Sequence, residues 1–279
     1  FISTTNNIFD IMRFALISSI LLLFEASPVK SQTERPRNQC GMPDDVRYHL
    51  LLTELSQVSS INDLSDSSTP QGKTMNWLAN EDGLGLCPGD VTLKQRYIVA
   101  LIYYTTNGDN WKRCYKTDNA CNRSPYLSPV TECKWGGLGC YPSGVVSKII
   151  LGSNNLNGRI PTEIYKLPRL RILKMEKNFL CGIFPTGIWY LPELTTLRID
   201  DNNIGGQIPQ ENITPMRNFI ISNNTFSGNI EGVGDLTTLK VLELQNNDFT
   251  GTIPARIANN AKISKIVWKY LVDEFYLER

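Results

Sequence analysis

The sequence has little excess charge and almost no histidine. Its 28 lysine and arginine residues are balanced by 27 aspartate and glutamate residues, so the formal net charge is +1. Such a balance does not predict binding to nucleic acid or to an anionic membrane. A single histidine, His49, leaves few partners for acid–base catalysis or for a zinc site. We therefore expect a protein that is not an enzyme and that needs neither a metal nor a small-molecule cofactor.

A long apolar run is also missing. The run from Phe14 to Phe24 is shorter than the roughly 20 residues that span a bilayer. Met12 and a basic residue precede it and small residues follow it, which is typical of a secretory signal peptide. We assign residues 1–31 to a signal peptide with an upstream extension. A buried strand or an uncleaved membrane anchor is the alternative.

The seven cysteines are spaced unlike zinc ligands. Cys114 and Cys121 are seven residues apart, and so are Cys133 and Cys140, whereas zinc knuckles space cysteines by two to four. Disulfides formed in an oxidising compartment are the better interpretation. Three tripeptides match the acceptor pattern for N-glycosylation, at Asn122, Asn212 and Asn223. The sequence thus predicts a secreted or cell-surface glycoprotein.

Asparagine, glycine and proline recur in five copies of one pattern. The first copy runs Val146-x-x-Ile149-x-Leu151-x-x-Asn154-x-Leu156-x-Gly158-x-Ile160-Pro161, and the fourth has Glu231 in place of the proline. The recurring asparagines are Asn154, Asn178, Asn202, Asn224 and Asn247, at spacings of 24, 24, 22 and 23 residues. A period of 20–29 residues with this pattern indicates a leucine-rich-repeat solenoid.

Each position of the repeat has a physical reason. Alternating apolar residues, as in Leu173-Lys-Met175, predict a strand, and successive strands stack into one parallel sheet. The asparagine amide both donates and accepts, so it can satisfy backbone groups where the coil turns. Glycine permits a positive φ or a close approach, and proline fixes φ on the far side. One coil cannot cover its own apolar face, so neighbours stabilise one another.

These motifs resemble those of a known family. Asn-Asn-Leu-Asn-Gly-Arg-Ile-Pro, residues 154–161, resembles the plant-type leucine-rich repeat, and Cys133-Lys-Trp-Gly-Gly-Leu-Gly-Cys140 resembles its N-terminal cap. The stretch from Leu101 to Trp111 is similar to the cap helix and turn of algal, especially diatom, members. The resemblance covers residues 67–254. It implies a right-handed horseshoe or superhelix with the parallel sheet on its concave face.

The same resemblance suggests what the chain does. Members of the family include receptor ectodomains, receptor-like proteins and secreted inhibitors of cell-wall hydrolases. Because the chain has no recognisable kinase motif, we expect an extracellular recognition module, such as a fragment of a receptor-like ectodomain. Its partner would be a protein, a peptide or a glycan. A structural scaffold of the cell wall or matrix is the alternative, and saturable affinity for one soluble partner would separate the two.

The cap is expected to contain disulfides and to cover the first coil with apolar side chains. Trp111 and Trp135 would seal the first coil, and a Cys133–Cys140 bridge would pin the loop beside them. Further expected bridges are Cys114–Cys121 and, with less support, Cys40–Cys87. Cys181 is then left over, either as a buried free thiol or as one half of an intermolecular bridge.

Helix signals precede the repeats. Residues 44–58 are a helical candidate, Thr69-Pro70 is a good helix start, and a further helix should begin at Asp90 as N-cap. The expected domains are a helical region (32–89), the cap (90–145), five repeats (146–262) and a degenerate sixth repeat or tail (263–279). Ile263, Ile266 and Trp268 keep the strand register, but Leu271 replaces the asparagine, and we slightly favour a truncated or altered end.

Solvent-facing strand residues should form columns along the concave face. Five strands span about 20–25 Å, which suits a short peptide, a glycan or one edge of a protein. The residues expected to contact a ligand carry mixed charges: Lys174, Glu176, Arg198, Asp200, Asp201 and Glu243. Asp200 and Asp201 are adjacent on an expected strand and should point to opposite faces unless the turn intervenes, so we do not expect them to form a catalytic pair. The alternative is a solvated face whose charges pair across strands.

Overall fold

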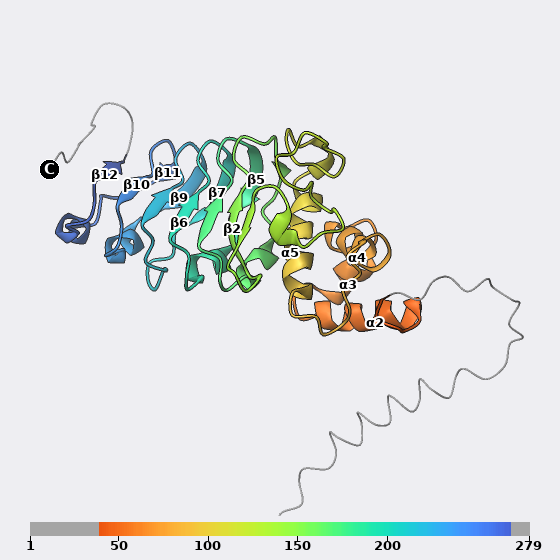
Figure 1. The fold of residues 1–279 in the computed structure, drawn as a ribbon. Coiled ribbons are helices and arrows are strands. Elements are labelled where there is room, and N and C mark those ends of the chain that lie inside the picture. Colours follow the sequence, from red (N-terminus) through yellow and green to blue (C-terminus); the bar gives the residue numbers. More distant parts are fainter. Residues whose placement is uncertain (1–38, 269–279) are drawn as a thin grey trace, which may run out of the picture. The chain divides into compact units, whose positions relative to one another are not determined.

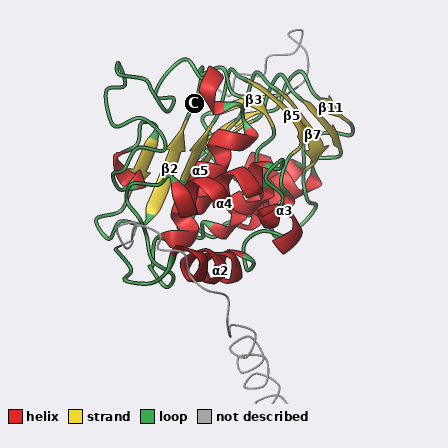
Figure 2. Ribbon diagram, turned by 90° about the vertical axis from the view of Figure 1, so that its right-hand side faces the viewer, coloured by secondary structure: helices red, strands yellow, loops and turns green. Residues whose placement is uncertain are grey.

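The computed structural model describes residues 39–268. The proposed signal peptide and the end of the proposed sixth repeat, including Leu271, lie outside the described residues. Strands follow one another along a stack, and four helices lie at one end of it (Figure 1). Figure 2, seen from that end, shows the helices in front of the strands. In the described part of the chain, none of the helices has the length and hydrophobicity that a membrane crossing requires.

The helices are α2 (Asp44–Leu55), α3 (Ile61–Ser65), α4 (Pro70–Asn80) and α5 (Leu93–Thr105). The first predicted helix is confirmed, although it ends three residues early. The second predicted start is also confirmed, because the Thr69 hydroxyl accepts a hydrogen bond from Gly72 N at 2.9 Å and Pro70 occupies the first position. The third start is wrong. The Asp90 carboxylate accepts a hydrogen bond from Cys87 N at 2.6 Å, and the helix begins only at Leu93.

One strand from each coil builds the main sheet. In spatial order its seven strands are β1 (Leu138–Cys140), β2 (Val146–Ile150), β4 (Ile172–Lys174), β6 (Thr196–Arg198), β8 (Asn218–Ile220), β10 (Val241–Glu243) and β12 (Lys265–Val267). The cap strand β1 is antiparallel to β2, and every later pair is parallel. Leu242 faces Ile266 across β10 and β12, which confirms that the strand register continues into a sixth coil.

The sequence analysis missed a second sheet. Its strands are β3 (Asn157–Gly158), β5 (Phe179–Ile183), β7 (Asn203–Gln207), β9 (Thr225–Gly228) and β11 (Asp248–Phe249). The repeat glycine lies within the first four of these strands and two residues after β11, with φ of 81° at Gly182 and 129° at Gly206, as the pattern predicted. Short 3-10 helices then close four coils: η3 (Thr162–Lys166), η4 (Thr186–Tyr190), η5 (Glu231–Asp235) and η6 (Ala255–Asn259). Glu231 therefore begins its 3-10 helix without the usual proline before it.

A buried arginine fastens the helices to the cap. Arg96 on α5 lies between the rings of Trp77 and Trp135, 5.3 and 4.7 Å from their centroids. Its guanidinium pairs with Asp82 at 2.6 Å and with Glu132 at 3.3 Å, and all three charged side chains are almost fully buried. Removing a charge from water is tolerated only with such pairing. The arginine thus connects α4, α5 and the cap loop.

Three disulfides staple this region, Cys40–Cys87, Cys114–Cys121 and Cys133–Cys140. All three expected bridges are therefore present, including the one with least support. Cys181 on β5 is a half-buried free thiol. Three bridges in one chain favour an oxidising, extracellular compartment.

Candidate ligand-binding surface

The asparagine of each repeat holds one coil to the next. Asn178 shows the full arrangement: its amide oxygen accepts hydrogen bonds from the backbone N–H groups of Asn154 and Leu156, at 2.9 and 3.0 Å. Its amide nitrogen donates to the carbonyl oxygens of Leu151 and Met175, at 3.0 and 2.9 Å. Asn202, Asn224 and Asn247 repeat this pattern with one accepted backbone hydrogen bond each. The amides are therefore directed into the coil and away from any ligand.

The first asparagine bonds to the cap instead of to a preceding coil. Asn154 Oδ1 accepts from Arg113 N at 2.7 Å, and Asn154 Nδ2 donates to Arg113 O at 3.2 Å. The cap thus supplies the backbone groups that a preceding repeat would offer. This continuity places the cap loop directly beside the first strand of the main sheet.

Strand pairing aligns the solvent-facing side chains in columns. Pairing joins Ile150 to Lys174, Lys174 to Arg198, Arg198 to Ile220 and Ile220 to Glu243. A second column lies two residues further along each coil, and we call it the acceptor column. It comprises Gly152, Glu176, Asp200, Ser222 and Gln245. Each expected contact residue on the strands therefore lies on one face of the main sheet.

A third column is a turn and not a strand. Ser153, Lys177, Asp201, Asn223 and Asn246 all have φ between 54° and 56°. This left-handed conformation is unusual outside glycine. For Asp200 and Asp201 the turn intervenes, because β6 already ends at Arg198 and neither residue lies on a strand. Asp201 accepts a hydrogen bond from the Asn223 amide, which accepts another from the Asn246 amide at 2.6 Å.

The mixed charges on this face are partly paired with one another. Arg198 Nε lies 3.0 Å from Asp200 Oδ1 and 3.8 Å from Glu176 Oε1. The hydrogen bond to Asp200 raises the pKa of Arg198 above its usual value, with further help from nearby carboxylates. Glu243 pairs with Lys265 across strands at 2.8 Å. Such pairs are expected of a solvated face whose charges pair with one another. A ligand would therefore have to contact side chains that are not already paired.

Two acceptors on the same column lack a donor. Glu176 Oε2 and Gln245 Oε1 are buried side-chain oxygens without a hydrogen bond among the described residues, and Tyr126 Oη in the cap is the third such atom. Buried polar atoms without partners are rare in folded proteins. Sequence patterns give no sign of them, because their burial depends on neighbouring coils. The oxygens of Glu176 and Gln245 are the part of the candidate site that the sequence analysis missed.

A hollow of about 500 Å³ adjoins Glu176 where the cap meets the sheet. Its walls include Arg113, Arg123, Glu176 and the Cys114–Cys121 bridge. Gly152 makes room for the carboxylate, because a Cβ there would lie 2.5 Å from Glu176 Cδ. The hollow is therefore continuous with the acceptor column, and its position could not be predicted without the cap's fold.

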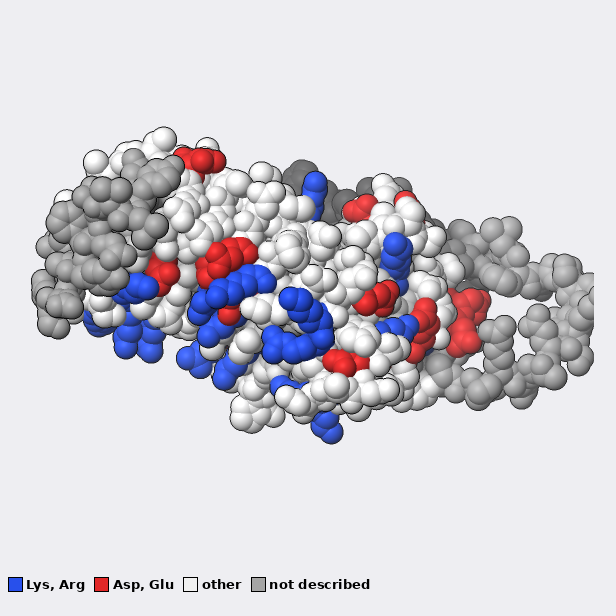
Figure 3. Space-filling model, turned by 90° about the horizontal axis from the view of Figure 1, so that it is seen from above, with Lys and Arg blue, Asp and Glu red and all other residues white. Residues whose placement is uncertain are grey.

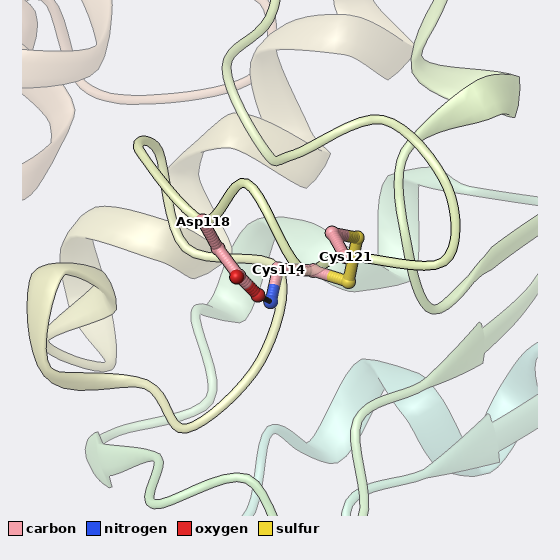
Figure 4. Close-up of side chains that lie close together, drawn as sticks. All are labelled: Cys114, Asp118 and Cys121. Carbon is pink, nitrogen blue, oxygen red and sulfur yellow. Dashed lines mark hydrogen bonds between the residues drawn. A yellow bond between two sulfur atoms is a disulfide. The ribbon is translucent and has the colours of Figure 1, made fainter.

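The cluster of Cys114, Asp118 and Cys121 beside the hollow is structural (Figure 4). Both sulfurs belong to one disulfide and so offer no thiolate to a metal ion. Asp118 accepts hydrogen bonds from the backbone N–H groups of Cys114 and Ala120. Its carboxylate therefore shapes the loop that forms one wall of the hollow.

The predicted glycosylation acceptors are all exposed, namely Asn122, Asn212 and Asn223. Asn122 lines the hollow and Asn223 belongs to the left-handed column. The modification itself remains a prediction. His49, the sole histidine, is exposed on α2, where its ring lies 2.7 Å from the Asp45 carbonyl oxygen and edge-on to the Tyr48 ring.

Stacked parallel coils, an asparagine in each turn and a stapled cap define a leucine-rich-repeat solenoid with a helical N-terminal region. The Leucine Rich Repeat family model matches residues 238–260. Phytosulfokine receptor 1 of Arabidopsis thaliana is 27% identical over an alignment of 194 residues, and the match covers 54% of this chain but only 19% of the receptor. The chain is a plant-type leucine-rich-repeat protein related in sequence to a plant receptor.

Two solved structures are similar to the chain, and the first of them shows the same fold. A plant ice-binding protein has 23% identity and a TM-score of 0.51, over 63% of this chain and 56% of that chain. The ectodomain of the receptor kinase SOBIR1 from Arabidopsis thaliana has 27% identity and a TM-score of 0.47, over 50% of this chain and 82% of that chain. The algal character of the cap stays a prediction.

Proposed function

We propose that the chain is an extracellular recognition module that binds an extended peptide segment across the main sheet. The observation that carries the proposal is the pair of donorless acceptors, Glu176 Oε2 and Gln245 Oε1, in one column of the sheet. A peptide offers backbone N–H groups and basic side chains that would satisfy them. Phytosulfokine receptor 1, by its name a receptor, gives independent support to a recognition role.

The geometry sets the size of the ligand. Glu176 and Gln245 belong to coils three strands apart, a separation of about 14 Å at the usual strand spacing. About four extended residues cover this distance. The hollow beside Glu176 would take one side chain, and the pairs of Arg198 with Asp200 and Glu176 would order the carboxylates in between.

The test starts from peptides selected out of a random display library on the full-length chain. The double variant E176A/Q245A should weaken the selected peptides at least tenfold, because two contacts of about 1 kcal/mol or more are lost. Its fold should survive, since neither oxygen is hydrogen-bonded within the described structure. Calorimetric titration measures the affinity.

The matched control removes the same side chains elsewhere. Gln207 lies on the second sheet and Glu231 on η5, and both are exposed. The variant Q207A/E231A should bind the peptides as the unchanged protein does. Equal affinity of all three proteins, or an equal loss in both variants, would reject the acceptor column as the site.

A further inference from the structure

The balanced net charge hides a one-sided distribution on the main sheet. Exposed cations gather toward the start of the strands. Arg171, Arg217 and Lys240 directly precede β4, β8 and β10, Lys148 is the third residue of β2, and Lys262 lies three residues before β12; we call these five residues the basic edge. Figure 3 shows lysine and arginine side chains gathered on one side of the repeat region, with fewer acidic ones among them. Where the strands end, by contrast, cations and carboxylates alternate around Arg198.

The solenoid places three of these cations in one column. Backbone hydrogen bonds put Arg171, Thr195, Arg217 and Lys240 in one column, with Thr195 N bonding to Arg171 O, Arg217 N to Thr195 O and Lys240 N to Arg217 O. Arg217 and Lys240 are therefore one strand apart, about 4.8 Å, and Arg171 lies two strands further along. Charge of one sign thus repeats in a line.

Among the described residues, no carboxylate forms a salt bridge with the cations at the centre of the line. Arg217, Lys240 and Lys262 line a hollow of about 370 Å³ whose fourth lining residue is Thr238. None of the three cations forms a salt bridge in the described part of the chain, whereas the nearby Arg169 and Lys265 pair with Glu193 and Glu243. Uncompensated like charges side by side repel one another and favour a bound anion.

We propose that the basic edge binds a linear acidic polysaccharide, a polymer with a carboxylate or sulfate on successive sugars. None of the exposed large hydrophobic side chains of the described structure lines the hollow between Arg217, Lys240 and Lys262, so this hollow lacks the aromatic or aliphatic anchor of a protein interface. Long, solvated cations in a line instead suit a flexible polymer of repeating charge. The site is separate from the acceptor column and does not depend on peptide binding.

The test measures binding of the full-length chain to alginate, a carboxylated polysaccharide, with neutral dextran as the reference polymer. The unchanged protein should bind alginate, with an affinity that falls as salt rises, and should ignore dextran. The variant R171Q/R217Q/K240Q should bind alginate roughly tenfold to a hundredfold more weakly, because each cation beside an anionic surface contributes appreciably.

A control with the same loss of charge separates a site from general attraction. Lys73, Lys112 and Lys134 are exposed cations outside the edge and form no salt bridge in the described structure. K73Q/K112Q/K134Q should retain alginate binding within about twofold, and the edge variant should retain the selected peptides. An equal loss in both variants, or no alginate binding at physiological salt, would overturn the proposal. Edge-dependent binding of polyglutamate as tight as that of alginate would overturn the choice of a polysaccharide.

Discussion

At each turn of the solenoid, a single asparagine amide satisfies several buried backbone groups. The amide oxygen of Asn178 accepts hydrogen bonds from two backbone N–H groups, and its amide nitrogen lies within hydrogen-bond distance of three carbonyl oxygens of the coils. A carboxylate could accept but not donate, and a hydroxyl is too short to reach both sides. This explains why asparagine, and no other polar residue, occupies the turn in all five repeats.

Replacing Asn178 by alanine should therefore cost about 2–4 kcal/mol of unfolding free energy, because several buried backbone groups lose their partners. Urea unfolding followed by tryptophan fluorescence measures the loss. Asn203 is an exposed asparagine in β7, and N203A should change stability by less than about 0.5 kcal/mol. Comparable losses in the two variants would show that the amide is not a structural bridge.

The asparagines that join the coils could be predicted from the sequence. The residues that we propose to bind a ligand could not. Asn154 and its equivalents stand at a fixed place in a repeating pattern, and pattern is what a sequence displays. Glu176 and Gln245 have no such mark. Their oxygens are buried by residues of neighbouring coils and of the cap, so they become distinctive only when the chain is folded.

Among the elements, α5 contributes the residue that joins the separate segments of the N-terminal region. Its charged residue Arg96 contacts two tryptophan rings and two carboxylates from separate segments. The sequence predicted a helix here and a tryptophan seal, but it gave Arg96 no role. Amphipathic patterns treat arginine as a surface residue, and only the approach of Asp82 and Glu132 makes its burial tolerable.

Substituting methionine for Arg96 should lower the unfolding free energy by about 3–5 kcal/mol, because Asp82 and Glu132 would remain buried without a cation. Lysine should not rescue the protein, since it cannot reproduce the planar fork between the two rings. Thermal and urea unfolding provide the measurement. R113M removes an exposed guanidinium that donates to Gly152 O, and it should cost under about 1 kcal/mol. Near-equal stability of R96M and R113M would contradict this account.

The second sheet shows the limit of prediction at the scale of elements. Two-residue strands such as β3 and β11 are too short to show alternation, and a positive-φ glycine is a poor strand signal. They pair because the main sheet has already fixed the spacing of the coils. Such strands follow from the stack and are not visible in any one repeat.

At the scale of the whole molecule, hydrogen bonds connect the helical region to the first repeat. We call this contact, between residues 157–163 and the helical region, the joint. The first strand of the second sheet bonds to the end of α5, with Asn157 N donating to Thr106 O at 3.0 Å and Arg159 N to Thr105 O at 3.2 Å. Glu163 of the first coil is buried and accepts hydrogen bonds from Ser59 at 2.7 Å and Gln71 at 3.0 Å. These bonds make the helices the closing unit of the stack.

The joint should make the helices and the repeats unfold together. Gly158 can occupy it only without a side chain, since a Cβ would lie 2.1 Å from Thr105 O. G158A/E163A should therefore cost about 3 kcal/mol or more and uncouple the two parts. Hydrogen exchange in moderate urea, followed by mass spectrometry, should then show residues 44–105 losing protection before residues 170–250.

The control variant G251A/E231A carries the same two substitutions at the far coils. Gly251 also has a positive φ, 83°, but the nearest atom to an added Cβ is 3.9 Å away, and Glu231 is exposed. It retains the strain of alanine at positive φ without the collision. In this variant the helices should remain protected as in the unchanged protein. If G158A/E163A also left both segments exchanging in step, the helices would be held by the Arg96 cluster and the cap alone, and the joint would be a contact without consequence for cooperativity.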